Sequence, residues 1–284
     1  MPLALLLTAG GVSFLAASAG AQDLSGAQDL FARGKYAEVI AMAEKQVKEG
    51  GYRTDWRVLL VKSLLEVGRY DEAYTNAQEG LDGFSANIPL RLLARQTALF
   101  HNKPAEANRR LVEIQSLLEQ RQPSYRDGEE LVALGQVLLL SGVEPRLVLE
   151  NCFQRAEKLT PPTREAFRAA GQLALDKHDY KLAADAFRAG LKTFPEDPGL
   201  ETGLAQAYAP DDAEEMGHAI EAALKTNPRH VPALLLLADH LIDAEQYDEA
   251  EKQLALALTV NPWQPEALAY RAVLAYLRNN AAAA

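Results

Sequence analysis

The stretch GRYDEA at residues 68–73 decides the fold, because close copies of it recur along the chain. The copies are GKYAEV at 34–39, HDYKLA at 178–183 and EQYDEA at 245–250, and NKPAEA at 102–107 keeps the alanine but replaces tyrosine with proline. Copies begin at residues 34, 68 and 102, so the period is 34 residues. A fixed period of this length is typical of an array of stacked helical units.

A second marker has the same period. Prolines at positions 161, 195, 228 and 262 are spaced by 34, 33 and 34 residues, and each follows an apolar segment. Proline cannot continue a helix, and it biases the residue before it toward extended backbone. Each proline therefore marks the end of one unit, and two markers with one period make chance an implausible explanation.

Small residues at fixed positions predict how the helices of each unit pack. The predicted turns lie at residues 34, 68, 102, 142, 178, 212, 245 and 279, and seven residues before them stand Ala27, Val61, Arg95, Gly135, Gly171, Ala205, Ala238 and Ala272. Small side chains let two helices approach closely, so the exception, Arg95, predicts a distorted third unit. The apolar stripe of such a pair cannot be buried by one pair alone, so neighbouring pairs must stack.

These residues resemble the tetratricopeptide repeat family, in which each unit has two antiparallel helices, a tight turn before Tyr-x-x-Ala, and a proline before the next unit. The resemblance covers roughly residues 22–284, as seven units and the beginning of an eighth. It implies an all-α fold, a right-handed superhelical solenoid of antiparallel helix pairs. It also implies that the first helices line a concave groove, which in this family binds an extended peptide or a partner helix.

Five glutamines are the most suggestive pattern in that expected groove. Six residues before the turns stand Gln28, Lys62, Gln96, Gln136, Gln172, Gln206, Asp239 and Val273. A glutamine side chain both donates and accepts hydrogen bonds, so a row of them can pair with an extended peptide backbone; alternatively, glutamine is a tolerated helix former at a half-exposed site. With two apolar residues four positions further on, the candidate groove residues are Lys62, Gln96, Phe100, Gln136, Leu140, Gln172, Gln206 and Asp239.

The family members that hold a C-terminal carboxylate use a basic clamp in the groove, and this sequence lacks it. Apolar or acidic residues such as Leu140, Asp176 and Asp243 stand where lysines would be needed. The groove therefore suits an apolar or mildly basic segment.

The ends and the middle of the chain differ from the regular repeat. Residues 1–21 contain no charged side chain and end in Ala19-Gly20-Ala21, which predicts a signal peptide cleaved after Ala21. Residues 22–119 are assigned to units 1–3, a polar irregular connection to 120–130, and units 4–7 with a truncated eighth to 131–284. We expect a periplasmic or secreted protein without a stable membrane span.

The composition excludes several classes of function. A net charge of −10 and the absence of a basic stripe argue against nucleic acid as a partner. The single cysteine, Cys152, lies in an apolar helical stretch and is interpreted as a buried structural thiol. The best metal candidate, Asp239-His240 with Asp243, is interpreted as a solvated or groove-facing helix patch, so no metal, cofactor or catalytic residue is predicted.

The sequence thus favours a non-catalytic protein-interaction scaffold of the cell envelope. Residues 131–277 are also similar to the repeat region of large secreted bacterial proteins, some of which continue into a zinc-peptidase-like domain. The alternative is therefore the substrate-recruiting arm of such a hydrolase, with its catalytic part beyond residue 284. A third hypothesis is self-association through the last unit, whose second helix is missing.

Overall fold

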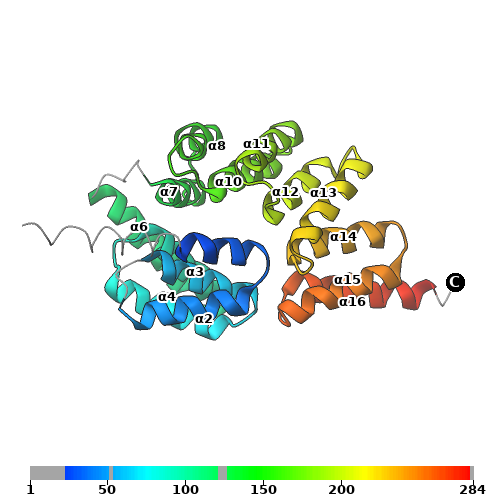
Figure 1. Cartoon of the computed structure of the whole chain (residues 1–284), viewed down its shortest axis with the longest axis horizontal. Coiled ribbons are helices and arrows are strands. Elements are labelled where there is room, and N and C mark those ends of the chain that lie inside the picture. Colours follow the sequence, from blue (N-terminus) through cyan, green and yellow to red (C-terminus); the bar gives the residue numbers. More distant parts are fainter. Residues whose placement is uncertain (1–22, 51–53, 121–126, 282–284) are drawn as a thin grey trace, which may run out of the picture.

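The computed structural model describes residues 23–50, 54–120 and 127–281, so the predicted signal peptide lies outside the described residues. Within these ranges the chain is helical, without a strand, and its helices pair in sequence order (Figure 1). Residues 23–32 form the first helix, and the others are α2 (Tyr36–Lys48), α3 (Thr54–Glu66), α4 (Tyr70–Gly83), α5 (Ile88–Phe100), α6 (Pro104–Gln120), α7 (Gly128–Leu140), α8 (Pro145–Val148), η1 (Leu149–Phe153), α9 (Gln154–Glu157), α10 (Arg164–Asp176), α11 (Tyr180–Thr193), α12 (Pro198–Tyr208), α13 (Ala213–Thr226), α14 (Val231–Asp243), α15 (Tyr247–Val260) and α16 (Pro265–Ala281).

Each repeat unit is one antiparallel pair of these helices. Unit 1 joins the first helix to α2, unit 2 joins α3 to α4, and unit 3 joins α5 to α6. The second helix of unit 4 consists of α8, η1 and α9 in succession, with the π-helical η1 between two α-helical ends. Units 5, 6 and 7 are α10 with α11, α12 with α13, and α14 with α15, and α16 follows alone. The predicted all-α solenoid of helix pairs is confirmed.

The turns inside the units form because the backbone becomes left-handed at the positions that the repeat marks. Gly34, Gly68 and Gly142 have φ of 73°, 74° and 82°, and Asn102 and His178 adopt 52° and 57°. In unit 1 the amide of Gly34 donates to the carbonyl of Phe31 and that of Lys35 to Leu30, which is the hydrogen-bond pattern that ends a helix at a left-handed residue. Glycine adopts this conformation without a steric penalty.

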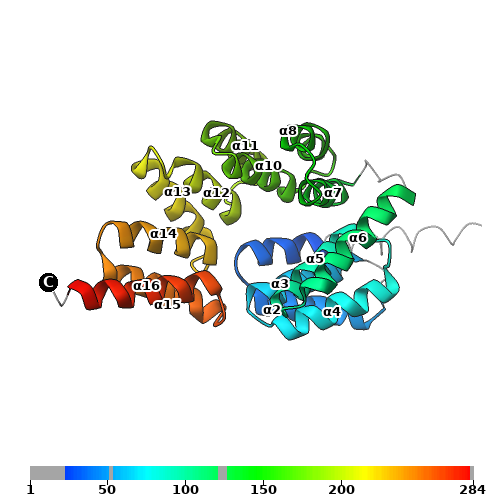
Figure 2. The same cartoon turned by 180° about the vertical axis from the view of Figure 1, so that it is seen from behind.

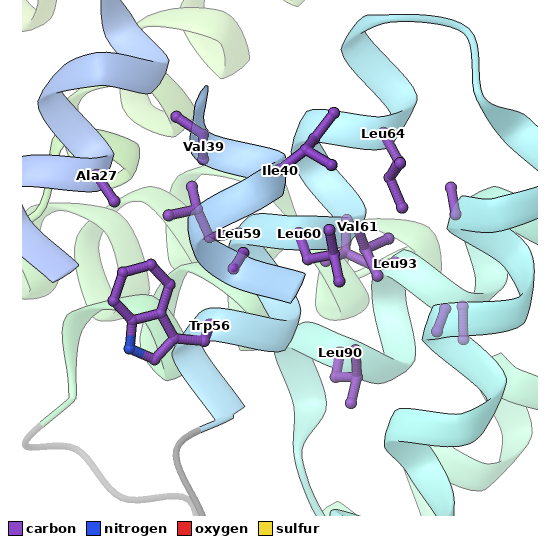
Figure 3. Close-up of a cluster of buried hydrophobic side chains, with 14 of the residues drawn as sticks. Ala27, Val39, Ile40, Trp56, Leu59, Leu60, Val61, Leu64, Leu90 and Leu93 are labelled. Carbon is purple, nitrogen blue, oxygen red and sulfur yellow. The ribbon is translucent and has the colours of Figure 1, made fainter. Parts of the chain in front are cut away.

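The core runs along the array as a series of apolar clusters between neighbouring units. In units 1–3, Trp56, Leu60 and Leu64 of α3 pack between the helices before and after it (Figure 3). The small-residue positions work as predicted in units 4 and 5, because a Cβ on Gly135 would overlap Phe153 and one on Gly171 would overlap Phe187. At each of these crossings the glycine has no side chain, so an aromatic ring from the second helix of the unit fills the space between the two helices.

The array curls so far that its beginning meets its end. Figures 1 and 2, which show opposite sides, place the first helix and α3 toward α10 and α12, and units 1 and 2 next to the units that precede α16. Hydrogen bonds join these distant segments: Lys62 of α3 bonds to Glu165 of α10, and Asn261 after α15 bonds to Tyr70 of α4. The first two units therefore lie across the inner side of units 4–7.

Candidate protein-binding site

The candidate groove residues all lie on the first helices of their units, but they differ in accessibility. Gln96 and Phe100 lie on α5, and Gln136 and Leu140 on α7; all four are exposed, Phe100 to 44% and Leu140 to 47%. These two helices belong to adjacent units that pack on each other. A strip of two amides and two large apolar side chains is thus open to solvent on units 3 and 4.

Two other candidates are engaged within their own neighbourhood. Gln172 on α10 is exposed, but its Nε2 donates to Asp176 Oδ1 one turn later at 2.9 Å. Asp239 on α14 is half-buried and accepts a hydrogen bond from the hydroxyl of Tyr270 on α16. Burial, followed by this carboxylate, raises the pKa of Tyr270 to about 12. Gln206 on α12 is half-buried. A role for the glutamines as a continuous peptide-binding row stays a prediction.

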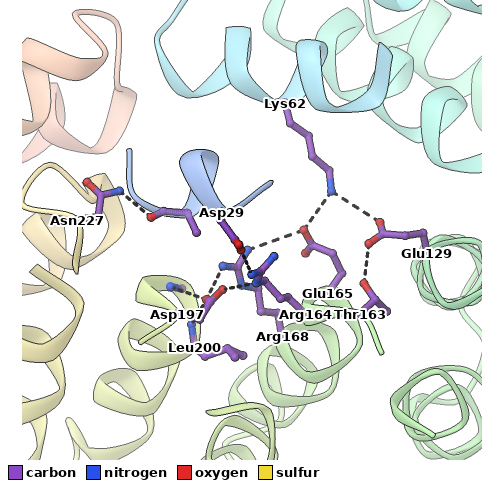
Figure 4. A network of polar contacts seen from close by, with 12 residues as sticks. Asp29, Lys62, Glu129, Thr163, Arg164, Glu165, Arg168, Asp197, Leu200 and Asn227 are labelled. Atoms are coloured by element: carbon purple, nitrogen blue, oxygen red, sulfur yellow. Dashed lines mark hydrogen bonds and ion pairs between the residues drawn. The ribbon is translucent and has the colours of Figure 1, made fainter. Parts of the chain in front are cut away.

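Lys62 has a different environment, because its amine reaches across the inside of the array (Figure 4). Its Nζ donates to Glu165 Oε1 at 3.0 Å and lies 3.9 Å from Glu129 Oε2. Glu165 lies on α10 and Glu129 lies on α7. The carboxylate of Glu129 also accepts a hydrogen bond from the Thr163 hydroxyl at 2.6 Å. A residue predicted to contact a partner therefore contacts the chain's own unit 4 and unit 5.

Two arginines of α10 extend this contact on both sides. Arg164 Nη2 donates to Asp29 Oδ1 of the first helix at 2.5 Å, and Arg168 Nη2 donates to Asp197 Oδ1 at 2.6 Å. Asp197 is itself fixed, because the same oxygen caps α12 by accepting from the amides of Gly199 and Leu200 at 3.0 Å. We call this set the closure network: Asp29, Lys62, Glu129, Arg164, Glu165, Arg168 and Asp197.

The charges of the closure network shift the pKa of its members in a consistent way. The amine of Lys62 lowers the pKa of Glu165 to about 2, with a further contribution from Arg168 and against the opposite effect of burial. Burial disfavours the charged amine of Lys62, but the carboxylates of Glu165 and Glu129 outweigh it and raise the pKa of this lysine. Burial raises the pKa of Glu129. At neutral pH, Lys62 and Glu165 are therefore a fully charged pair.

A second type of contact joins the two sequence markers of the repeat. Asn227 and Asn261, each followed by a proline, are buried, with 1% and 4% exposed. Asn227 Nδ2 donates to the carbonyl of Ala32 at 3.4 Å, and Asn261 Nδ2 donates to the Tyr70 hydroxyl at 2.9 Å. A Cβ on Gly34 or Gly68 would overlap Asn227 or Asn261 respectively. The glycine turns of units 1 and 2 thus abut the asparagine-proline connections before α14 and α16.

Other candidate sites are weaker. A surface pocket of about 520 Å³ between α4 and α6 contains Arg91 and Arg110, but both pair with Glu113 inside it. Among the described residues, no cluster of three or more His, Cys, Asp or Glu side chains could hold a metal ion. None of the helices in the described ranges is long and apolar enough to cross a membrane.

Comparison with known proteins agrees with this geometry. Residues 209–274 match the tetratricopeptide repeat family. The chain is also similar in structure to a tetratricopeptide repeat protein from Parabacteroides merdae, with 15% identity, a TM-score of 0.50, and coverage of 84% of this chain and 92% of that chain. The crystal structure of yeast Tom70 is similar with 16% identity and a TM-score of 0.52 over 84% of this chain. The fold is that of a tetratricopeptide repeat solenoid.

Two of the matched chains are considerably longer than this one. The chain spans 54% of the length of the matched chain in the APC/C hetero-tetramer Cut9–Hcn1, where the identity is 15% and the TM-score 0.48, and 50% of the length of Tom70. No curated protein matches the sequence. At these identities the likeness shows the architecture.

Sequence reasoning missed most of the closure network. Lys62 was among the predicted groove residues, but Glu129, Glu165 and Asp197 lie near the starts of first helices. Acidic residues in a first turn are favoured by the helix dipole, so their presence there gives no signal of a long-range contact.

Proposed function

We propose that this protein is a non-catalytic scaffold that binds another polypeptide on the concave face of its solenoid. The observation that supports the proposal is the exposed strip on α5 and α7, where Phe100 and Leu140 stand 44% and 47% exposed beside Gln96 and Gln136. Large apolar side chains at equivalent positions of adjacent units offer anchors for a partner, and the amides of Gln96 and Gln136, four residues earlier on each helix, offer hydrogen bonds to its backbone. No observation on the described residues favours the hydrolase alternative.

Site-specific photo-crosslinking tests the proposal. We would place a photoreactive phenylalanine analogue at Gln96 or Gln136 and irradiate cells that express the full chain. The same analogue at Lys45, whose side chain is 70% exposed on α2, serves as the control. We expect a discrete crosslinked partner from positions 96 and 136 only. Replacement of Phe100 and Leu140 by serine should abolish it, and an identical pattern from position 45 would refute a groove-specific function.

The proposal includes export to the cell envelope, which is supported by the uncharged segment 1–21 and its small residues at 19–21. Intact-mass measurement of the protein from the envelope fraction tests this part. We expect a mature chain that begins at Gln22. Recovery of the full-length chain from the cytoplasmic fraction alone would refute export and leave the binding proposal to its own test.

A further inference from the structure

The contact that closes the array is polar, whereas the contacts that build the array are apolar. The apolar cluster of units 1–3 runs from Leu24 to Ala94, and the described clusters of units 5–7 contain no residue of units 1 or 2. Unit 2 meets units 4 and 5 through the contacts from Lys62 to Glu165 and Glu129, and through the electrostatic attraction between Glu66 and Arg168. Ion pairs that are partly open to solvent weaken with salt and with competing charges, while the apolar clusters do not.

Lys62 is also the only lysine or arginine that units 1 and 2 contribute to the closure network. The part of the network on units 4–6 has three carboxylates, from Glu129, Glu165 and Asp197, against two arginines. Asp197 is matched by Arg164 and Arg168 at 3.2 and 2.6 Å. Without Lys62, Glu165 would keep Arg168, whose Nη1 lies 3.8 Å away, and the weaker attraction of Arg164. Glu129 would keep the hydrogen bond from the Thr163 hydroxyl. Glu129 and Glu165, which hold the amine of Lys62, thus form a preformed site for a cation.

We propose that the inner surface formed by α7, α10 and the start of α12 binds a polypeptide segment through a lysine side chain, and that Lys62 of the chain itself occupies this site in the closed form. The proposal rests on the scaffold function and names the chemistry of its partner. A basic segment inserts its ammonium group between Glu129 and Glu165 in place of Lys62. Units 1–3, which share one apolar cluster, then move away together from units 5–7. The hydrogen bonds of Asp29, Ala32 and Tyr70 to the later units break in the same movement.

Competition between Lys62 and the lysine of the partner sets the apparent affinity of the protein for the partner. A partner that binds only the open form has its apparent affinity reduced by the fraction of molecules that are open. A charge-assisted hydrogen bond in a partly buried site contributes enough to change that fraction about tenfold. The closed form is therefore an autoinhibited state, and removal of Lys62 should relieve it.

Pentalysine binding to the full chain tests the proposal without the natural partner. We would label pentalysine with fluorescein and measure its anisotropy with wild type, Lys62→Gln and Lys45→Gln; the two variants carry the same change of net charge. Lys45 lies on the outer face, 70% exposed. We expect Lys62→Gln to bind about tenfold more tightly than Lys45→Gln or wild type. Addition of Glu165→Gln to Lys62→Gln should remove the gain.

Equal affinities of Lys62→Gln and Lys45→Gln would overturn the proposal, as would a gain that survives Glu165→Gln. Small-angle scattering gives an independent measurement. The radius of gyration should rise in Lys62→Glu and return to the wild-type value when Glu165→Lys is added, because the reversed pair restores the attraction. If Lys62→Glu does not fold, judged by its circular dichroism, the charge-reversed double variant and Lys62→Gln decide the outcome. A scaffold that crosslinks its partner equally well in wild type and Lys62→Gln would keep its proposed function and lose this mechanism.

Discussion

A glycine at a helix crossing gives the most direct test of how the units pack. Gly171 lies inside α10, where alanine is intrinsically more stable than glycine by about 0.5–1 kcal/mol. A Cβ at this position would, however, lie less than 3.0 Å from three carbons of the Phe187 ring. We therefore expect the crossing to decide the sign of the effect.

The magnitude follows from how little room the ring has. Phe187 is 2% exposed, and its ring also lies against Gly203 of α12, where a Cβ would overlap it as well. The ring cannot retreat without moving α12, and overpacking of a buried site costs about 1–3 kcal/mol. Subtraction of the gain in helix propensity leaves Gly171→Ala less stable by up to about 2.5 kcal/mol.

Urea unfolding followed by circular dichroism measures this difference, and Gly217→Ala is the matched control. Gly217 lies in α13 and is exposed, and a Cβ added to it would meet no atom within 4 Å, so its replacement should stabilise the protein by about 0.5–1 kcal/mol. Addition of Phe187→Leu to Gly171→Ala should recover part of the loss. If Gly171→Ala were as stable as Gly217→Ala, the close-approach argument for the small-residue positions would be wrong.

Three further predictions concern the closure and the single thiol. A double-mutant cycle of Tyr70→Phe and Asn261→Ala should show a coupling of about 0.5–1.5 kcal/mol in urea unfolding, because the 2.9 Å hydrogen bond joins a buried amide to a half-buried hydroxyl; additive effects would contradict it. Lys62 lowers the pKa of Glu165 from 4.5 to about 2, so the contribution of this carboxylate to stability is present above pH 4.5 and is lost as the pH falls toward 2. In Glu165→Gln the free energy of unfolding should therefore fall less between pH 4.5 and 2 than in the wild type. Cys152 is 3% exposed and burial raises the pKa of its thiol, so it should react with dithiobis(nitrobenzoate) only after unfolding, and fast labelling of the native protein would refute its burial.

The sequence was informative about the fold because the markers of the repeat act locally. A left-handed residue at position 34 or 68 ends one helix whatever the rest of the chain does, and a small residue at 135 or 171 sets how closely two helices cross. Each of these effects is decided by residues within one unit, so one sequence was sufficient to predict the helix pairs and their order. The distribution of exposed groove positions on α5 and α7 follows from the same register.

The closure network was not predictable in the same way, because it depends on the accumulated rotation of several units. Each crossing adds a small angle, and a change of a few degrees per unit would carry Lys62 of α3 away from Glu165 on α10. No local pattern reports that sum. The family resemblance implies that Lys62 lies on an inner face, but only the assembled array shows what that face contacts.

The asparagine-proline connections show how residues at equivalent positions of a repeat can nevertheless form such a long-range contact. Asn227 meets the turn at Gly34, and Asn261, one unit later, meets the turn at Gly68, also one unit later. From the first contact to the second, the glycine and the asparagine each move one unit along the chain. Such a shift is expected between successive turns of one superhelix, so it requires a similar rotation at each helix crossing that separates the two sides of the contact. In each contact the turn residue is a glycine, the residue type without a side chain to obstruct the asparagine. The closure therefore depends on the regularity of the whole array, and a distortion at any crossing between units 2 and 7 should weaken both contacts together.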